Sequence, residues 1–265
     1  MYRALFFSDP IFGPIMKVYI FMVGAVIGSF LNVCIYRIPR HESVVSRRSH
    51  CPNCDTLICW YQNIPILSYL FLRGHCANCK HFISPTYPIV ELATGLVFLF
   101  LYKRFGISMI LAIYGFFACN MIVLLFIDYY HRLLPFLFTI PGILIGFAVS
   151  FVNPLLAPKE SLEGIVLGGG LFLFIYVAFR LIRKKEGMGQ GDIFLMAMVG
   201  AFLGPELTLI VLFASTLIGM FVALIAMIAF RKGSDFPYPF GSFIAIAAVL
   251  AIFFGYPTWW RLFGH

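Results

Sequence analysis

Long apolar runs decide the fold class of this chain. Seven of them approach or exceed the ~20 residues that a helix needs to cross the hydrocarbon core of a bilayer, and a shorter one covers residues 193–204. With 62% hydrophobic and 11% charged residues, the sequence predicts an all-α polytopic membrane protein of about eight transmembrane helices. The seven longer runs cover residues 15–36, 87–102, 107–127, 133–152, 162–182, 206–230 and 239–256.

The distribution of basic residues predicts the orientation of these helices. Because Lys and Arg accumulate on the cytoplasmic side of a membrane, the loop between the first two runs is predicted to face the cytosol. The net charge of +8 is therefore interpreted mainly as a topology signal, with attraction to anionic membrane lipid as a second consequence. No nucleic-acid partner is expected. The basic residues of that loop are Arg37, Arg40, Arg47, Arg48, Arg73 and Lys80.

The chain divides into three predicted parts, which are a first transmembrane helix (1–36), a cytosolic loop domain (37–86) and a membrane domain (87–265). The loop domain contains two C-x-x-C pairs whose spacing matches a four-thiolate zinc ribbon or knuckle. A reducing cytosol favours metal over disulfides. Since sulfur would fill all four positions, the predicted zinc is structural. The four predicted ligands are Cys51, Cys54, Cys76 and Cys79.

Three carboxylates lie inside or at the edges of apolar runs, where an acid is costly and indicates function by default. They are Glu91, Asp128 and Asp192. Alternation of the helices predicts that Asp128 and Asp192 share the cytosolic face. Two aspartates at one membrane boundary suggest an aspartic protease dyad, in which one carboxylate deprotonates water while its protonated partner polarises the peptide carbonyl. Because Asp128 ends a helix and Asp192 begins one, the helix dipoles predict that Asp128 more often holds the shared proton.

Three glycines precede Asp192 in the stretch GMGQGD: Gly187, Gly189 and Gly191. Glycine adopts positive φ freely and has no Cβ, so the stretch predicts close approach of a second helix or of a substrate backbone to Asp192. An ordinary helix start with an N-capping aspartate has the same pattern. The motif alone leaves both readings open.

Seven stretches, in order along nearly the whole chain, resemble the bacterial type IV prepilin peptidases. The resemblance implies an inner-membrane aspartic endopeptidase of the G-x-G-D class, which removes the leader of prepilins or pseudopilins after a glycine at the cytosolic face. Many members also methylate the new N-terminal amine with S-adenosylmethionine. The stretches are GSFLNVCIYRIPR (28–40), the two C-x-x-C pairs, NIPILSYLFLRG (63–74), SPTYPIVELATG (84–95), FIDYYHRLLP (126–135), GMGQGD (187–192) and PFGSFIAIAAVLA (239–251).

The resemblance also assigns residues. It identifies Asp128 and Asp192 as the catalytic pair and the four paired cysteines as zinc ligands, and Glu91 matches the acid of the family's YPxVE stretch. Many relatives carry charges where this chain has Tyr130, Phe136 and Phe194, so contacts made by those charges are absent here. The complete cysteine set favours the form with both activities. The residues associated with methylation by this resemblance are Gly28, Ser29, Phe30, Leu31, Asn32, Val33 and Glu91.

Two other functions remain open from the residues themselves. An ion- or proton-coupled transporter would place Glu91, Asp128 and Asp192 along its path, and it predicts inverted repeats, which the sequence does not display. A membrane thiol oxidoreductase would use the C-x-x-C pairs, and it requires exposed, reversible thiols in place of bound zinc.

Overall fold

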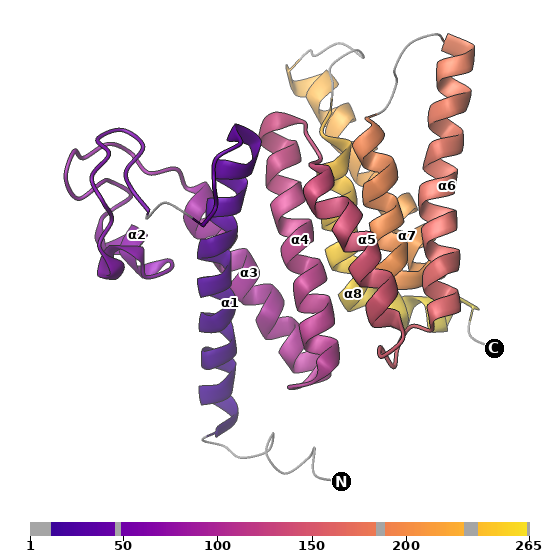
Figure 1. Ribbon diagram of the computed structural model, residues 1–265, viewed down its shortest axis with the longest axis horizontal. Helices are drawn as coiled ribbons and strands as arrows, with labels where there is room; N and C mark the ends of the chain where they lie inside the picture. The colour runs from indigo at the N-terminus through magenta and orange to yellow at the C-terminus, as the bar shows by residue number, and fades with distance from the viewer. Residues whose placement is uncertain (1–11, 46–48, 184–188, 231–237, 264–265) are drawn as a thin grey trace. The chain divides into compact units, whose positions relative to one another are not determined.

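A computed structural model describes residues 12–45, 49–183, 189–230 and 238–263 (Figure 1). Within these residues the chain is mostly helical and has no β-strand, only the isolated bridges His50–Leu57 and His75–Phe82. The chain forms two compact units, Met1–Leu111 and Ala112–His265. The all-α architecture expected from the apolar runs is confirmed.

Each unit is built from helices that follow the apolar runs closely. The first unit contains α1 (Phe12–Arg37), the 3₁₀ turns η1 (Ile38–Arg40) and η2 (Trp60–Asn63), the short helix α2 (Leu67–Phe71) and α3 (Thr86–Phe105). The second unit is formed by α4 (Met109–His131), α5 (Phe136–Ser150), α6 (Pro158–Arg183), α7 (Gln190–Phe230) and α8 (Phe240–Phe263).

Helices α1 and α3 pack closely because α1 presents glycine to its neighbour. A Cβ atom at Gly24 would lie 2.9 Å from the Cα atom of Gly95, and one at Gly28 would lie 2.8 Å from the Cα atom of Glu91. Small residues allow membrane helices to approach in this way. Helix α3 thus belongs to the first unit by its packing, although almost all of its sequence falls within the predicted membrane domain (87–265). The boundary at residue 87 stays a prediction.

Helix α7 is sharply bent, which explains why its sequence reads as two apolar runs. Gly204 has φ 77° and ψ 176°, and Pro205 follows it. Proline supplies no N–H to the helix ladder, and a Cβ atom at Gly204 would lie 2.8 Å from Cδ1 of Leu156. The hydroxyl of Thr208 donates to the Gly204 carbonyl oxygen at 2.6 Å. The runs 193–204 and 206–230 are therefore the two arms of one bent helix.

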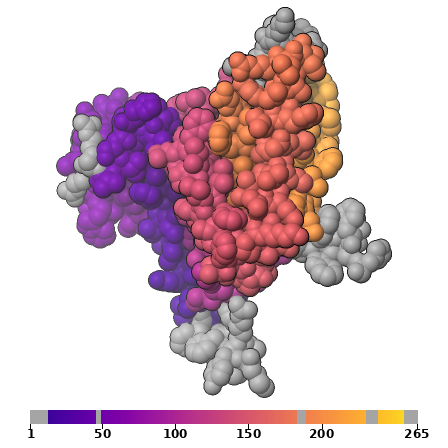
Figure 2. All heavy atoms as spheres, turned by 45° about the vertical axis from the view of Figure 1, so that its right-hand side comes forward, coloured from indigo at the N-terminus to yellow at the C-terminus, as the bar shows by residue number. Residues whose placement is uncertain are grey.

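Several of these helices can cross a bilayer. In the described part of the chain, four spans meet the length and hydropathy required of a membrane helix, and two apolar helices, Phe136–Ser150 and Phe240–Gly255, are shorter. Apolar side chains of α5 and α6, red to orange, cover much of the face turned to the viewer in Figure 2. Such a surface suits lipid, so the chain is a multi-pass membrane protein. The four spans are Gly13–Arg40, Met109–His131, Pro158–Ile182 and Gln190–Ala229.

Candidate active site and metal centre

Asp128 is held by the first turn of another helix. It lies in the last turn of α4 and is only 5% exposed. Its Oδ2 atom accepts a hydrogen bond from the backbone N–H of Ser242 at 2.6 Å and lies 3.0 Å from the Ser242 hydroxyl. Ser242 is the third residue of α8. The free N–H groups and the dipole of a helix N-terminus favour a negative charge there.

The prediction that Asp128 more often holds the shared proton considered α4 alone, and these contacts at the start of α8 act against it. The Ser242 hydroxyl has only one hydrogen to donate. Its oxygen also lies 2.9 Å from the Leu125 carbonyl oxygen, which is a second possible acceptor. The two acceptors compete, but an ionised carboxylate is the stronger. The positive charge of Arg132 also acts on Asp128. The hydrogen bonds from Ser242 and the charge of Arg132 therefore favour the anion of Asp128, against the cost of its burial.

Asp192 lies in the first turn of α7 and is 7% exposed. Its backbone N–H donates to the Gly189 carbonyl oxygen at 3.2 Å, and its carboxylate lies near the Gly189 N–H. It also interacts electrostatically with the carboxylate of Asp128. The structure thus brings together two acids that are 64 residues apart in the sequence.

Leu134 fills the space between the starts of α7 and α8. A Cβ atom at Gly191 would lie 2.6 Å from the Leu134 Cβ, and one at Gly241 would lie 2.9 Å from the Leu134 Cδ1 and 3.1 Å from Oδ2 of Asp128. Both helix starts therefore need glycine in order to approach Leu134. Sequence reasoning missed Leu134, Gly241 and Ser242, although the last two lie within the PFGSF stretch that carried the family resemblance.

The glycines before Asp192 differ in what they do. Gly187 lies outside the described residues. Neither Gly189 nor Gly191 is among the glycines with positive φ in the described chain. Backbone conformation therefore does not explain why glycine occupies these two positions. Gly191 makes the close approach to Leu134, whereas a Cβ atom at Gly189 would meet only Oδ2 of Asp192, at 3.5 Å.

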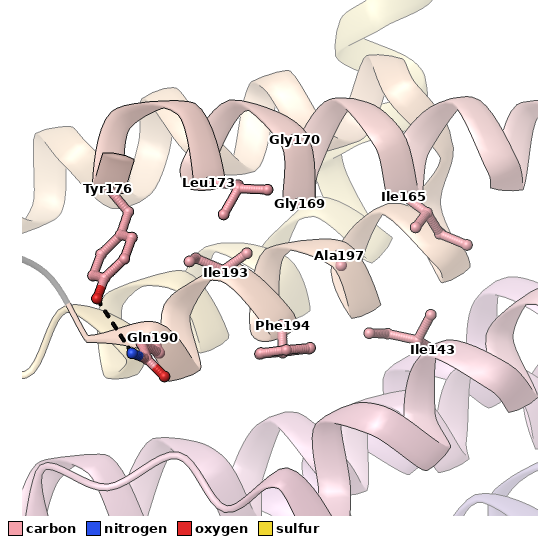
Figure 3. A pocket seen from close by; sticks show the side chains of 10 residues that line it. All are labelled: Ile143, Ile165, Gly169, Gly170, Leu173, Tyr176, Gln190, Ile193, Phe194 and Ala197. Atoms are coloured by element: carbon pink, nitrogen blue, oxygen red, sulfur yellow. Dashed lines mark hydrogen bonds between the residues drawn. The ribbon is translucent and has the colours of Figure 1, made fainter. Parts of the chain in front are cut away.

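An apolar groove of about 500 Å³ lies between α5, α6 and α7 (Figure 3). At one end the Nε2 atom of Gln190 donates to the Tyr176 hydroxyl at 3.2 Å. The residues of α7 that line the groove form one stripe along the helix. Because successive residues of a helix are turned by about 100°, Asp192 lies on the side of α7 opposite this stripe. The groove is therefore not part of the acid pair's site. The α7 stripe consists of Gln190, Ile193, Phe194 and Ala197, and the other lining residues are Ile143, Ile165, Gly169, Gly170, Leu173 and Tyr176.

Two of the three departures from the family pattern meet in space. The rings of Phe136, at the start of α5, and Phe194, in α7, are 5.1 Å apart and nearly perpendicular. Edge-to-face contacts of this kind are favourable for aromatic pairs. An apolar contact thus joins the two positions. Tyr130 is exposed and lies against Tyr129, with ring centroids 5.1 Å apart.

The four paired cysteines form a compact sulfur cluster in the first unit. All four Sγ atoms lie within 4.8 Å of one another, and those of Cys51 and Cys79 are 3.8 Å apart. Tetrahedral zinc with bonds of about 2.3 Å places its sulfur ligands about 3.8 Å apart. The cluster can therefore hold a metal ion, and its geometry fits zinc. The neighbouring His75 lies outside it, with Nδ1 2.6 Å from the Arg73 carbonyl oxygen.

The two halves of this cluster repeat one another at an offset of 25 residues. The N–H of Cys51 donates to the Thr56 carbonyl oxygen at 3.0 Å, and that of Cys76 donates to the His81 carbonyl oxygen at 2.8 Å. Aligning HCPNCDTL (50–57) with HCANCKHF (75–82) would have predicted this repeat from the sequence. Each half is a tight turn that supplies two sulfurs to the cluster.

Two asparagines connect the halves. Asn53 donates toward the Cys79 sulfur at 3.7 Å, and Asn78 donates toward the Cys54 sulfur at 3.9 Å. The hydroxyl and backbone N–H of Thr56 lower the pKa of the Cys54 thiol to about 6. Metal binding needs thiolates, so the surroundings of Cys54 favour the ligand form. Sequence reasoning missed both asparagines.

The GSFLNV stretch and Glu91 together join α1, α3 and the loop. Gly28 packs on the backbone of Glu91, as described above, while Asn32 Nδ2 donates to the Tyr87 carbonyl oxygen at 3.0 Å. The buried Glu91 accepts the N–H of Ile66 at 2.7 Å and thereby caps α2. These contacts give Gly28, Asn32 and Glu91 a structural role. The remaining residues of the stretch differ in burial: Leu31 is buried, Ser29 and Val33 are partly buried and Phe30 is exposed.

Comparison with known proteins gives this arrangement a family. The model of the bacterial peptidase A24 N-terminal domain matches residues 22–105, and that of the type IV leader peptidase family matches residues 115–224. A relative from Stutzerimonas stutzeri, a prepilin leader peptidase/N-methyltransferase, is 33% identical over 262 residues, covering 88% of this chain and 89% of the relative. This chain belongs to the type IV leader peptidase family.

Other members of the family are similar over most of this chain. Proteins with the same name from Dichelobacter nodosus and Myxococcus xanthus are 34% and 40% identical. The first match covers 93% of this chain and 95% of the relative. The second covers 82% of this chain but 65% of the longer Myxococcus protein. No solved structure matches the chain significantly. Nothing in the comparisons supports the transporter alternative.

Proposed function

We propose that this protein is a membrane-embedded aspartic endopeptidase that cleaves the leader peptides of type IV prepilins or pseudopilins. The observation that carries the proposal is the buried pair Asp128 and Asp192, held by the ends of α4, α7 and α8 in a chain of this family. Cleavage follows a glycine at the cytosolic face of the bacterial inner membrane. The basic loop supports this orientation.

In the proposed mechanism the two acids have different roles. Asp128, whose anion Ser242 stabilises, takes a proton from water, and the resulting hydroxide attacks the scissile carbonyl carbon. Protonated Asp192 donates a hydrogen bond to the carbonyl oxygen and stabilises the tetrahedral intermediate. The proton gained by Asp128 passes to the leaving amine as the C–N bond breaks. Because the two carboxylates interact electrostatically, they do not both ionise comfortably, which keeps one proton on the pair.

Ser242→Ala tests this division of roles. Loss of the hydroxyl removes a donor to ionised Asp128, so the carboxylate protonates at a higher pH. A hydrogen bond to a charged group contributes about 1.5–3 kcal/mol, so the acidic limb of the kcat/KM profile should move up by at most about 1–2 pH units. A prepilin cleavage assay across pH measures the shift, and Ser242→Thr should retain the wild-type profile. An unchanged limb in Ser242→Ala would assign the base role elsewhere.

Gly191→Ala and Gly189→Ala form a matched pair. A Cβ atom at Gly191 would lie 2.6 Å from the Leu134 Cβ, whereas at Gly189 it would meet only a carboxylate oxygen at 3.5 Å. Since a misplacement of about 1 Å costs a catalytic site about 100-fold, we expect Gly191→Ala to lose cleavage to that extent and Gly189→Ala to stay within a few-fold of wild type. Equal kcat values for the two variants would contradict the packing argument.

We also propose that the four cysteines hold structural zinc and that the protein methylates the new N-terminal amine with S-adenosylmethionine. The cluster geometry supports the metal, and the names of the relatives support the methyl transfer. The transfer requires a deprotonated amine positioned in line with the donor methyl. Incubating the purified protein with a prepilin and labelled S-adenosylmethionine tests it. Label is expected on the cleaved product only, and cleavage without label would remove this second activity.

A further inference from the structure

An uncharged segment of the first unit exposes a concentration of large apolar side chains. Residues 60–71, WYQNIPILSYLF, include η2 and α2 and carry no Asp, Glu, Lys or Arg. Trp60 is 80% exposed and Phe71 84% exposed. Such a patch on a water-facing loop would be unfavourable. Its exposed members, called the aromatic patch below, are Trp60, Tyr61, Leu67, Leu70 and Phe71.

The contacts of Glu91 fix the level of this patch along the membrane helices. Ile66, the residue before α2, donates its N–H to Glu91, and Glu91 packs against Gly28 of α1. Gly28 lies nine residues before the end of α1 at Arg37, or about 13 Å along the helix at 1.5 Å per residue. The start of α2 is thus held beside a membrane-spanning helix, well inside its end. Figure 1 shows α2 alongside α1 and α3 rather than beyond their ends.

The attachment is specific and holds the backbone in an unusual conformation. Ile66 has φ 63° and ψ −50°, and a β-branched residue with positive φ is a rare, strained conformer. The carboxylate of Glu91 accepts its N–H at 2.7 Å. The surrounding structure therefore imposes the position of α2, and the chain does not adopt it by local preference.

The chemistry around the patch matches the headgroup region of a bilayer. Trp and Tyr favour the boundary between hydrocarbon and water, where a ring is buried while its polar atom stays hydrated. The exposed Arg73 follows Phe71 by two residues, and Lys80 is exposed farther along the loop. Basic side chains beside an apolar face attract anionic lipid headgroups.

We propose that the aromatic patch is a membrane anchor, with η2 and α2 lying in the bilayer interface beside α1 and α3. The partner is the lipid surface itself. The loop thereby becomes a monotopic element between α1 and α3, and the sulfur cluster is held close to the headgroups. The inference stands independently of the proposed catalytic activity.

Tryptophan fluorescence tests the anchor directly. The chain has three tryptophans, so Trp259→Phe/Trp260→Phe leaves Trp60 alone. We expect Trp60 in phosphatidylethanolamine/phosphatidylglycerol liposomes to emit at blue-shifted wavelengths and to lose intensity when the liposomes contain acyl-brominated phosphatidylcholine. Quenching should be stronger with bromines near the headgroup than with bromines deep in the chain. The difference between wild type and Trp60→Phe yields the same signal without changing Trp259 or Trp260.

Two outcomes would overturn the proposal. Quenching of Trp60 by acrylamide but not by bromolipid would place the patch in water. Protection from both quenchers that disappears as the protein is diluted into excess lipid would make a second copy of this chain the occupant.

Phe71→Asp is expected to weaken the bromolipid quenching, while Val45→Asp is the matched control, since Val45 is 94% exposed but outside the patch. Equal loss in both variants would count against the patch.

Discussion

Asp128→Asn and Asp192→Asn are each expected to abolish prepilin cleavage. The first variant cannot take the proton from water. The second cannot supply the acidic proton that polarises the scissile carbonyl. Since a positioned acid or base contributes about 10²–10⁴-fold to the rate, each variant should be at least about 100-fold slower than wild type. The effect should appear in kcat, measured by the gel shift of a prepilin substrate in liposomes.

The matched control for these variants is Glu163→Gln. Glu163 is an exposed acid on α6 that pairs with Lys159 at 3.7 Å. The Glu163→Gln variant should therefore cleave prepilin at the wild-type rate. Because asparagine preserves the shape of aspartate and glutamine that of glutamate, all three variants should stay folded, which retained bound metal and unchanged helical circular dichroism would verify. Full cleavage by both folded aspartate variants would return Asp128 and Asp192 to a structural role.

Cys51→Ser should cause the second large effect, the loss of the metal. Serine replaces a thiolate with a neutral hydroxyl, and a four-sulfur site gains its stability from all of its ligands together. We expect the zinc content to fall from about one ion per chain to nearly none. The loop between Arg37 and Thr86 should then become sensitive to protease, because it has little apolar core of its own. Elemental analysis and limited proteolysis measure the two effects.

Cys59→Ser is the corresponding control, because Cys59 is exposed and lies outside the sulfur cluster. It should retain the zinc and the protease resistance of wild type. Acid should release the metal from wild type, because protons compete for the thiolates. Full zinc content in Cys51→Ser would contradict four-sulfur ligation and would reopen the redox interpretation of the cysteine pairs.

Much of the fold could be predicted from one-dimensional patterns. The apolar runs predicted the helices because a chain in lipid must satisfy its backbone hydrogen bonds within each segment. The C-x-x-C spacing predicted the sulfur cluster because a tight turn brings residues i and i+3 to one ion. The bend of α7 also left a trace in the sequence, since Gly204 and Pro205 interrupt an otherwise continuous apolar stretch.

The expectation about the shared proton shows what such patterns leave out. The helix dipole of α4 was a correct local argument for Asp128. The contact with Ser242 joins residues 114 positions apart, however, and periodicity carries no information about such a pair. The positive-φ argument for Gly189 and Gly191 was likewise local, whereas the need for glycine at Gly191 comes from Leu134 on another segment.

By itself, the sequence determined the membrane environment, the helices and the pairing of the cysteines, and it predicted the two acids of the proposed active site, because each follows from residue type and spacing. Tertiary structure alone decided which helix end meets which acid, that Glu91 caps α2 beside α1, and which glycines are sterically required. Those features depend on side chains from distant segments meeting at distances of a few ångströms, and the packing of whole helices determines these distances.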